Sequence, residues 1–256
     1  MNKIIALEKL FHTGLVVRTL VVEVKDLVKN FGPIKAVNGA SFNVNEGEIF
    51  GLIGPNAAGK TTILRIISTL LRITSGSVNV FGYDVAEEAD RVRRLISYLP
   101  EDAGAYKNLT GRAYLNFIAR FFGSGGETKK IVERGLEIAN LGERIDDKVD
   151  TYSKGMIRRL LVGRALMIEP KLAILDEPTA GLDVTNAREI REIIKKFAKR
   201  GTTVLLSSHN MLEVEFLCER IALINEGEIV EEGNAPGLKS KYQAENLEEV
   251  FTRVVS

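Results

Sequence analysis

The chain has 256 residues, which is enough for one large α/β domain but too few for two complete nucleotide-binding domains. Its 35 basic and 34 acidic residues nearly cancel, so no nucleic-acid partner is expected from charge, and its single cysteine excludes an internal disulfide and suits a reducing compartment. No run of about 18 apolar residues occurs, so the chain is not expected to span a membrane by itself.

Residues 1–20 carry the weakest pattern in the chain. Charged side chains such as Lys3 and Glu8 interrupt the apolar residues and break any signal-peptide core. Ile4 and Leu7 would share one face of a helix, but a loose extension or a translation start placed too far upstream fits equally well. We therefore treat this segment as an N-terminal extension of unassigned role, followed by one domain over 21–256.

The first part of that domain has the patterns of strands and one helix. From residue 20 to 44 apolar residues tend to alternate with polar ones, as at Val22 and Val24, which is typical of short half-buried strands. The apolar run 49–53 predicts a buried strand, and residues 61–71 have the apolar spacing of a helix. The elements predicted next are a strand over 77–81, a helix over 86–95 and a short strand over 97–99.

A phosphate-binding loop connects the predicted strand 49–53 to the predicted helix. Its sequence fits GxxxxGK[ST] at every required position, although a mere Gly-rich turn is the alternative. Small residues allow a tight turn with inward-facing N–H groups, and the helix that starts near Gly59 directs its positive end at the same phosphates. Lys60 supplies a charge to the β- and γ-phosphates, and the Thr61 hydroxyl can bind Mg²⁺. The predicted phosphate-binding residues are Gly54, Pro55, Asn56, Ala57, Ala58, Gly59, Lys60, Thr61 and Thr62.

The middle of the domain is predicted to be helical. Between residues 103 and 170 there is little strand signal. Helical periodicity covers 113–122, 129–141 and 156–168. We interpret 103–162 as an inserted helical subdomain, and 21–102 together with 163–256 as the catalytic core with its β subdomain.

The α/β alternation resumes with the continuous apolar run 172–175, the pattern of a parallel strand buried on both faces. Asp176 and Glu177 directly follow this run, and open parallel sheets place their ligand chemistry at the carboxyl ends of strands. We predict that Asp176 binds Mg²⁺ and that Glu177 orients or deprotonates the attacking water, with a solvated strand end as the alternative. The later elements are a helix over 187–198, a strand over 203–207, a helix over 211–219, strands over 221–224 and 228–230, and an amphipathic helix over 246–255.

A further segment precedes the Asp176 strand and reads Tyr152, Ser153, Lys154, Gly155 and Met156. With the two phosphate motifs, it makes the chain resemble the nucleotide-binding subunit of an ABC transporter from about residue 22 onward. In that family the segment is a signature that opens a helix and contacts the γ-phosphate held by the other subunit, as anion binding at helix ends explains. The residues carried over are Ser153, Lys154, Gly155 and Met156; read alone, Ser153 is a helix N-cap, and Lys154 departs from a common glycine.

The resemblance also implies roles for three residues outside these motifs. Asp183 matches the D-loop that lies across a dimer interface, with a helix N-cap as the simpler alternative. His209 matches the switch histidine that reaches the γ-phosphate and helps to position the water, although a lone histidine is more often a packing or surface residue. Phe31 stands where the family stacks an aromatic residue on adenine, and the alternative is a core aromatic at a strand end.

Two positions depart from the common family pattern. Glu101 lies where many members have a glutamine that senses the nucleotide and contacts the membrane partner, and its carboxylate can still bind Mg²⁺. Ala57 replaces a glycine of the phosphate loop, and if that position needs a positive φ, alanine strains the loop. Glu101 and the signature segment both resemble the ABC-2-type export branch of the family.

The resemblance implies an α/β fold in which a P-loop NTPase core with a mostly parallel sheet carries an antiparallel β subdomain and an inserted helical subdomain. It implies an ATPase that uses ATP and Mg²⁺, with Thr61, Asp176 and Glu101 at the metal, and that forms a homodimer or a heterodimer with another ATP-binding subunit. The expected activity is export through a separately encoded transmembrane permease, with this subunit peripheral on the cytoplasmic face of the membrane. Two alternatives stay open: a soluble ABC-type ATPase that acts on ribosomes or DNA, and a catalytically weak subunit of a heterodimer.

Overall fold

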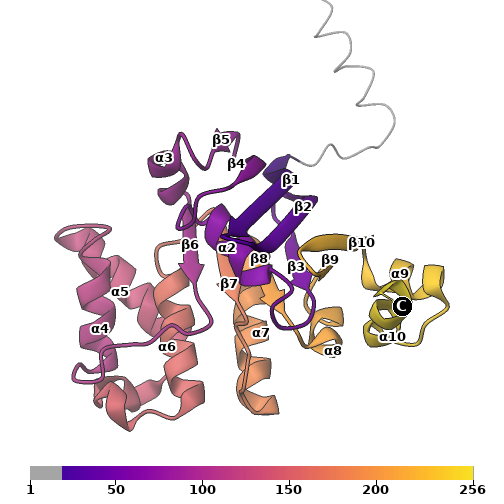
Figure 1. Ribbon diagram of the computed structural model, residues 1–256. Coiled ribbons are helices and arrows are strands. Elements are labelled where there is room, and N and C mark those ends of the chain that lie inside the picture. Colours follow the sequence, from indigo (N-terminus) through magenta and orange to yellow (C-terminus); the bar gives the residue numbers. More distant parts are fainter. Residues whose placement is uncertain (1–18, 256) are drawn as a thin grey trace, which may run out of the picture.

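A six-stranded sheet forms the centre of the molecule, whose computed structural model describes residues 19–255 apart from the side chains of residues 212 and 213 (Figure 1). Its strand order is β10-β9-β3-β8-β7-β6, and all neighbours are parallel except β10, which runs antiparallel to β9. Strands β3, β7 and β8 are buried along their whole length, as expected where both faces of a parallel sheet are covered. The strands are β3 (Ile49–Ile53), β6 (Ile96–Leu99), β7 (Leu172–Asp176), β8 (Thr203–Ser208), β9 (Arg220–Asn225) and β10 (Glu228–Gly233).

A second, antiparallel sheet of four strands has the order β2-β1-β4-β5. Its inward-facing apolar residues share one buried cluster with residues of β3, β7 and β8 and with helix α2 (Lys60–Ile67), so this sheet and α2 cover one face of the central sheet. The fold is therefore the predicted core with a mostly parallel sheet and an antiparallel β subdomain. The strands are β1 (Leu20–Phe31), β2 (Ile34–Asn45), β4 (Ser75–Val80) and β5 (Tyr83–Asp84).

Of the remaining helices, α3 packs beside β5, on the side of the antiparallel sheet, and the others lie on the other side of the central sheet and around its edges (Figure 1). Helices α4, α5 and α6 pack together, as predicted for the helical insert, while α9 and α10 gather beside β10. Two short 3₁₀ helices, Gly142–Asp146 and Val149–Thr151, connect α5 to α6. The other helices are α3 (Ala89–Arg93), α4 (Gly111–Ala119), α5 (Gly126–Ala139), α6 (Lys154–Leu166), α7 (Val184–Ala198), α8 (Met211–Glu215), α9 (Ala235–Tyr242) and α10 (Leu247–Val255).

Three helices are shorter than their sequence patterns predict, and one was not predicted. Helix α2 stops at Ile67 because Thr69 adopts a left-handed φ of +62°, which ends the regular helix. Helix α3 starts late because Asp84 accepts the N–H groups of residues 86 and 87 and holds them in a turn. Helix α8 ends at residue 215 instead of 219, and α9, which is capped by Asn234, escapes the periodicity pattern.

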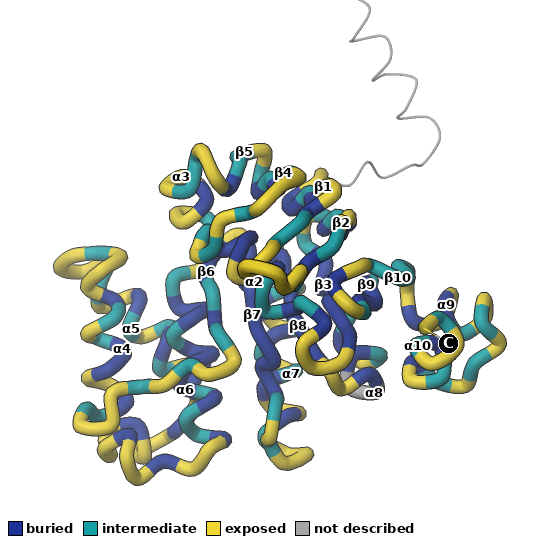
Figure 2. Tube along the Cα trace, in the orientation of Figure 1, coloured by how far each residue is buried: buried dark blue, intermediate teal, exposed yellow. Residues whose placement is uncertain are grey.

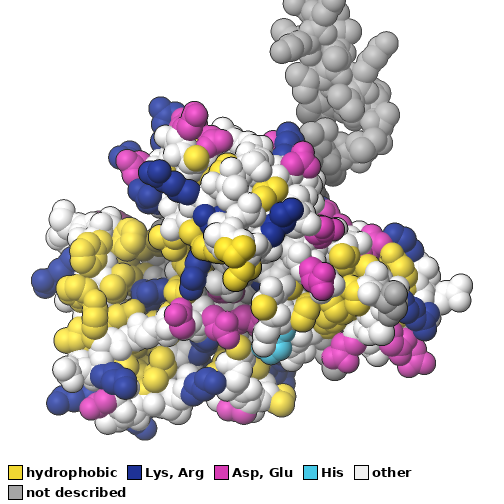
Figure 3. Space-filling model, viewed as in Figure 1, with side chains coloured by type: hydrophobic (Ala, Val, Ile, Leu, Met, Phe, Trp, Pro, Cys, Tyr) yellow, Lys and Arg dark blue, Asp and Glu magenta, His cyan; other side chains and the backbone are white. Residues whose placement is uncertain are grey.

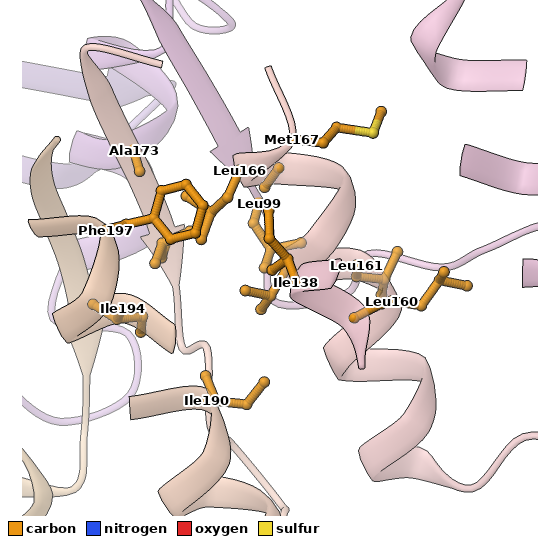
Figure 4. Close-up of a cluster of buried hydrophobic side chains, with 14 of the residues drawn as sticks. Leu99, Ile138, Leu160, Leu161, Leu166, Met167, Ala173, Ile190, Ile194 and Phe197 are labelled. Atoms are coloured by element: carbon orange, nitrogen blue, oxygen red, sulfur yellow. The ribbon is translucent and has the colours of Figure 1, made fainter. Parts of the chain in front are cut away.

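The helical insert does not have a core of its own. Residues of α4, α5 and α6 belong to the same buried cluster as residues of β7, β8 and α7, and Figure 4 shows Leu161 and Leu166 of α6 in that cluster with Ile190, Ile194 and Phe197 of α7. In Figure 2 the strands of the central sheet form the buried centre to which all of these helices are attached. The predicted subdomain limit at residue 162 falls inside α6, so a division there would cut a continuous helix.

Two further predictions concern the N-terminal extension and membrane-spanning helices. The predicted N-terminal extension, up to residue 18, lies outside the described residues. Within residues 19–255, no helix combines the length and the apolar character that crossing a lipid bilayer requires.

Candidate ATP-binding site

The predicted phosphate loop forms a tight turn between β3 and α2. Close backbone contacts require glycine at two of its positions: a Cβ atom at Gly54 would lie 2.1 Å from the carbonyl oxygen of Ile224, and one at Gly59 would lie 2.6 Å from that of Ala36. The loop also accepts a 3.0 Å hydrogen bond from the N–H of Gly227 in the β9–β10 turn. The phosphate loop is therefore packed against both β2 and the β9–β10 turn, which lie next to each other.

Ala57 lies in this loop with a φ of +65°, in the left-handed region that favours glycine. The sequence predicts strain at Ala57 if this position has a positive φ, and the φ is positive. An L-residue in the left-handed conformation costs roughly 1–2 kcal/mol because its Cβ approaches the following carbonyl oxygen. The loop therefore stores a modest conformational strain at Ala57.

Lys60 turns back over the loop and faces the acids at the end of β7. Its ammonium donates to the carbonyl oxygens of Gly54 at 2.7 Å and Pro55 at 3.0 Å, and lies 3.4 Å from a carboxylate oxygen of Glu177. Together with Glu101, the loop and Glu177 line a cavity of about 310 Å³. Larger hollows occur elsewhere, with volumes of about 610 and 660 Å³ among α4 to α7 and about 540 Å³ beside α3. They are lined by side chains of both charge signs, so chemistry and not size identifies the site.

Asp176, the last residue of β7, is fully buried and surrounded by hydroxyl groups. Its Oδ1 accepts hydrogen bonds from Ser207 at 2.5 Å and Thr61 at 3.2 Å, and its Oδ2 accepts one from Tyr98 at 3.3 Å. Burial, followed by the negative charge of Asp176, raises the pKa of the Tyr98 phenol to about 12, so this phenol stays a donor at neutral pH. The phosphate loop and β7 thus present adjacent oxygen ligands.

Glu177 and His209, the two residues predicted to be catalytic, lie in contact. Oε2 of Glu177 is 2.9 Å from Nδ1 of His209, and the Glu177 side chain is buried while the imidazole is 48% exposed. The Glu177 N–H donates to the Ser207 hydroxyl at 3.0 Å, and Glu177 has a left-handed φ of +48°. The carboxylate therefore lies between the imidazole of His209 and the ammonium of Lys60.

The signature residues begin helix α6 and lie next to Asp183. The Ser153 hydroxyl caps α6 by accepting the Met156 N–H at 3.2 Å, and Asp183 caps α7 by accepting the Asn186 N–H at 2.9 Å. This backbone hydrogen bond lowers the pKa of the exposed Asp183 carboxyl. A Cβ atom at Gly155 would lie 2.2 Å from the Asn186 side chain, so any larger residue there would displace Asn186. Ser153 and Asp183 thus both cap helices, and of the signature residues Ser153 and Lys154 are exposed.

Lys154 is an exposed cation at the first position of α6, close to Gly181 in the segment before Asp183. It makes no hydrogen bond or ion pair with the rest of the described chain. A cation at a helix N-terminus is disfavoured by the helix dipole, so the position gains nothing from Lys154 locally.

Glu101 and Phe31 lie at or near the ends of two different strands, β6 and β1. Glu101 follows β6, lines the cavity beside the phosphate loop, and offers its carbonyl oxygen to the Arg158 guanidinium at 3.1 Å. Burial lowers the pKa of the Arg158 guanidinium, whose neighbours include the Glu101 carboxylate. Phe31 ends β1 and is 47% exposed, which disagrees with the alternative of a core aromatic, and the Lys29 ammonium lies 4.9 Å from its ring centroid.

A family model described as ABC transporter matches residues 37–180, more than half of the chain. The chain belongs to the ABC transporter family. This ABC subunit is 39% identical over 226 residues to the linearmycin resistance ATP-binding protein LnrL of Bacillus subtilis (strain 168), a match that covers 88% of the subunit and 73% of LnrL. It is 39% identical to the daunorubicin/doxorubicin resistance ATP-binding protein DrrA of Streptomyces peucetius, with 87% and 68% of the two chains covered.

Solved structures agree with this assignment. The ABC subunit superposes on an ATP-binding subunit of an ABC transporter with a TM-score of 0.82 at 27% identity, covering 92% of this chain and 100% of the other. It also matches the ATP-binding cassette MJ0796, solved as a dimer bound to ADP and Pi, with a TM-score of 0.75 at 28% identity and coverage of 83% and 98%. The predicted family, fold class and function as an ATP-binding, ATP-hydrolysing transporter subunit are confirmed.

Four residues that contact the predicted site are not singled out by the sequence motifs. Ser207 and Tyr98 donate to Asp176, Arg158 holds the Glu101 segment, and Asn186 joins the signature to Asp183. Ser207 and Tyr98 both lie on strands that neighbour β7, so a strand order would have identified them. Arg158 lies one turn beyond the signature on α6, where a charged residue at a buried helix position is the available signal.

Proposed function

We propose that this ABC subunit hydrolyses MgATP through Glu177 and His209, and that closure of two subunits around ATP drives export through a separate permease. The observation that carries the proposal is the position of the Glu177 carboxylate, 2.9 Å from His209 and 3.4 Å from Lys60 at the carboxyl end of β7. An acid held between a phosphate-binding lysine and a histidine is suited to orienting a water for attack on the γ-phosphate.

An exchange of partners at Lys60 would couple ATP binding to this chemistry. Before ATP binds, the Lys60 ammonium is shared between two loop carbonyls and the Glu177 carboxylate. The γ-phosphate carries more negative charge than a carboxylate, so Lys60 is expected to turn toward it. Glu177 then keeps His209 as its cationic or donor partner and can accept a proton from the attacking water, while the exposed imidazole reaches the γ-phosphate.

The Thr61 hydroxyl and the Asp176 carboxylate fit the ligand preferences of Mg²⁺ in this proposal. They are hard oxygen donors that lie 3.2 Å apart, one on the phosphate loop and one on β7. Mg²⁺ held there would neutralise charge on the β- and γ-phosphates. Glu101 lines the same cavity and is proposed as a further oxygen ligand. Phe31, exposed at the end of β1, is proposed to stack on adenine, which discriminates weakly between bases.

The signature and Asp183 are proposed to complete the ATP site of a second subunit. None of the signature residues is among the described residues that line the phosphate-loop cavity. They instead begin α6, with Ser153 and Lys154 exposed, Met156 half-buried and Gly155 buried, and the backbone N–H groups and the Ser153 hydroxyl of this helix start are proposed to bind a phosphate. ABC cassettes form dimers, as the MJ0796 structures show, which supports this arrangement for either a homodimer or a heterodimer.

A transmembrane permease is the proposed partner on the helical side of the subunit. An aromatic surface formed by Tyr106, Phe117, Phe121 and Phe122 lies on and beside α4, with each ring between 43% and 71% exposed. Tyr106, Phe117 and Phe121 form edge-to-face contacts in sequence, and hydrophobic side chains gather over α4 in Figure 3. Exposed aromatic patches mark protein interaction sites, and Tyr106 follows Glu101 closely in the sequence, so we propose that this surface contacts the permease. That contact would hold the subunit on the cytoplasmic face of the membrane.

Export is the direction of transport that the relatives favour. LnrL and DrrA are named resistance ATP-binding proteins, and BcrA of Bacillus licheniformis, 38% identical to this subunit with 83% of this chain and 69% of BcrA covered, is named for bacitracin transport. The Lys154 form of the signature and Glu101 are in keeping with the export branch. The neutral charge balance gives no support to the alternative of an ATPase acting on DNA or ribosomes.

Replacing Glu177 with glutamine tests the proposed mechanism. Glu177→Gln should bind MgATP and accumulate as an ATP-dependent dimer, with hydrolysis slowed at least about a hundredfold because an amide does not accept the proton. Glu169→Gln is the matched control, since Glu169 lies on the surface and its side chain is 59% exposed. ATP turnover and dimer formation by size-exclusion chromatography measure the two effects. Unchanged turnover in Glu177→Gln contradicts the assigned base, and recovery with ribosomes instead of a membrane permease contradicts the transporter role.

A catalytically weak subunit paired with a more active one is a second candidate, favoured by the left-handed φ of Ala57. A strained phosphate loop would hold phosphates less well than a loop with glycine at that position. Hydrolysis by the purified homodimer, measured beside Ala57→Gly, distinguishes this candidate from a fully active subunit.

A further inference from the structure

The Ser207 side chain lies directly between the two acids that end β7. Ser207 is fully buried on β8 and is the ladder partner of Asp176. Its hydroxyl donates to Oδ1 of Asp176 at 2.5 Å and accepts the N–H of Glu177 at 3.0 Å. A serine hydroxyl carries one donor hydrogen and acceptor lone pairs, so this group serves both acids at once.

The two acids converge on one site although they are neighbours in the sequence. In a regular strand, successive side chains point to opposite faces. Here Asp176 contacts Thr61 and Glu177 lies 3.4 Å from Lys60, and these two partners are adjacent at the start of α2. The left-handed backbone of Glu177, at a φ of +48°, breaks the strand alternation and permits this convergence. Such a conformation is unfavourable for a residue with a Cβ, so contacts must hold it.

We propose that Ser207 is a positioning residue for ATP hydrolysis, which holds the Asp176 carboxylate and the Glu177 turn in register. The inference rests on the proposed function, in which Asp176 binds Mg²⁺ and Glu177 activates water. The other donors to Asp176 are longer, at 3.2 Å from Thr61 and 3.3 Å from Tyr98. The Thr61 hydroxyl is also the one that the proposed metal uses, so Ser207 is the shorter of the two donors that stay free to hold Asp176, the other being Tyr98.

The two hydrogen bonds of Ser207 predict two separable kinetic effects. Loss of the bond to Glu177 should lower kcat, because the carboxylate no longer has a fixed direction toward the water. Loss of the bond to Asp176 should raise the Mg²⁺ concentration needed for half-maximal activity. Removing a group that orients a metal ligand or catalytic side chain typically costs about 10- to 100-fold in metal affinity or activity. Binding of ATP without Mg²⁺ depends on the phosphate loop and should change less than about twofold.

The experiment compares Ser207→Ala, Ser207→Cys and Ser207→Thr in the full chain. Ser207→Ala should lower kcat about 10- to 100-fold and raise the Mg²⁺ requirement about tenfold. Ser207→Cys keeps the size of the side chain with a poorer donor, so it should show a similar but smaller loss if it folds as wild type does. Ser207→Thr keeps the hydroxyl and should recover most of kcat. Binding of a fluorescent ATP analogue without Mg²⁺ and thermal unfolding are measured on each variant.

Ser68→Ala is the matched control for losing a buried hydroxyl. Ser68 is 3% exposed, and its hydroxyl donates to the Leu64 carbonyl at 2.7 Å, beyond the end of α2. It should lose stability without a change in kcat or in the Mg²⁺ requirement. Equal kinetic losses in Ser68→Ala and Ser207→Ala would make the effect one of stability and would overturn the inference.

Comparison with Glu177→Gln separates the inference from the function on which it rests. If Glu177→Gln is inactive while Ser207→Ala keeps both kcat and the Mg²⁺ requirement within about twofold of wild type, the inference on Ser207 is overturned and the proposed function stands. If Glu177→Gln turns over ATP at the wild-type rate, the proposed base is wrong and the Glu177 half of the inference fails with it.

Discussion

Ala57→Gly is expected to stabilise the ABC subunit, because it removes the strain in the phosphate loop. The φ of +65° at Ala57 costs an L-residue roughly 1–2 kcal/mol and a glycine almost nothing. Glycine also makes the unfolded chain more flexible, which offsets about 0.4–1 kcal/mol of this gain. The net increase in the free energy of unfolding is then about 1 kcal/mol, which corresponds to a rise in Tm of about 2–4 °C for a chain of this size.

Thermal unfolding of the two neighbouring variants Ala57→Gly and Ala58→Gly measures this directly. Ala58 is 3% exposed and has no positive φ, so glycine there should lower the free energy of unfolding by about 0.5–1 kcal/mol or more. Opposite shifts in Tm at adjacent loop positions are the expected result. A Tm for Ala57→Gly at or below that of wild type refutes the strain argument. ATPase activity that rises with Ala57→Gly supports the weak-subunit candidate, and unchanged activity removes its motive.

Two further predictions concern the dimer and permease surfaces. Asp183→Ala should lower Tm at pH 7, and its difference in Tm from wild type should narrow below about pH 4. The reason is that the lowered pKa of Asp183 gives stability that is present above the pKa of the unfolded state and is lost as the pH falls through the pKa of the folded state. A difference in Tm that does not depend on pH contradicts this. Phe117→Ser combined with Phe121→Ser should weaken association with permease-containing membranes about tenfold or more while leaving basal ATPase activity in place, as co-sedimentation measures; undiminished binding moves the permease surface elsewhere.

The phosphate loop and the acids of β7 could be predicted because their chemistry is written in consecutive residues. The loop from Gly54 to Thr62 places every required group at a fixed spacing, and the apolar run before Asp176 marks a strand whose carboxyl end must lie at a sheet edge. The contact between Glu177 and His209 could not be predicted from sequence motifs. Their contact joins residues 32 apart, and it depends on β8 lying beside β7 in the sheet.

The parts that escaped the sequence are set by single residues and by tertiary contacts. In the sequence, Glu177 has the pattern of an ordinary strand end, and its residue type does not predict a left-handed backbone. Thr69 likewise has a left-handed φ that its residue type does not predict, and this conformation ends α2 early. Helix α9 was missed because its apolar periodicity is weak, although Asn234 followed closely by a proline is a recognisable helix start.

Because both sheets contact the phosphate loop, ATP is a ligand of the whole molecule and not of one loop. Ala36 of the antiparallel sheet and Gly227, in the turn between β9 and β10 of the central sheet, both contact the loop, so the loop keeps its shape only where both sheets are in place. A ligand that binds only the assembled form adds about 2.7 kcal/mol at a hundred times its Kd. That free energy opposes every opening motion that separates the two sheets, and so ATP acts as a removable cross-link between halves of the chain.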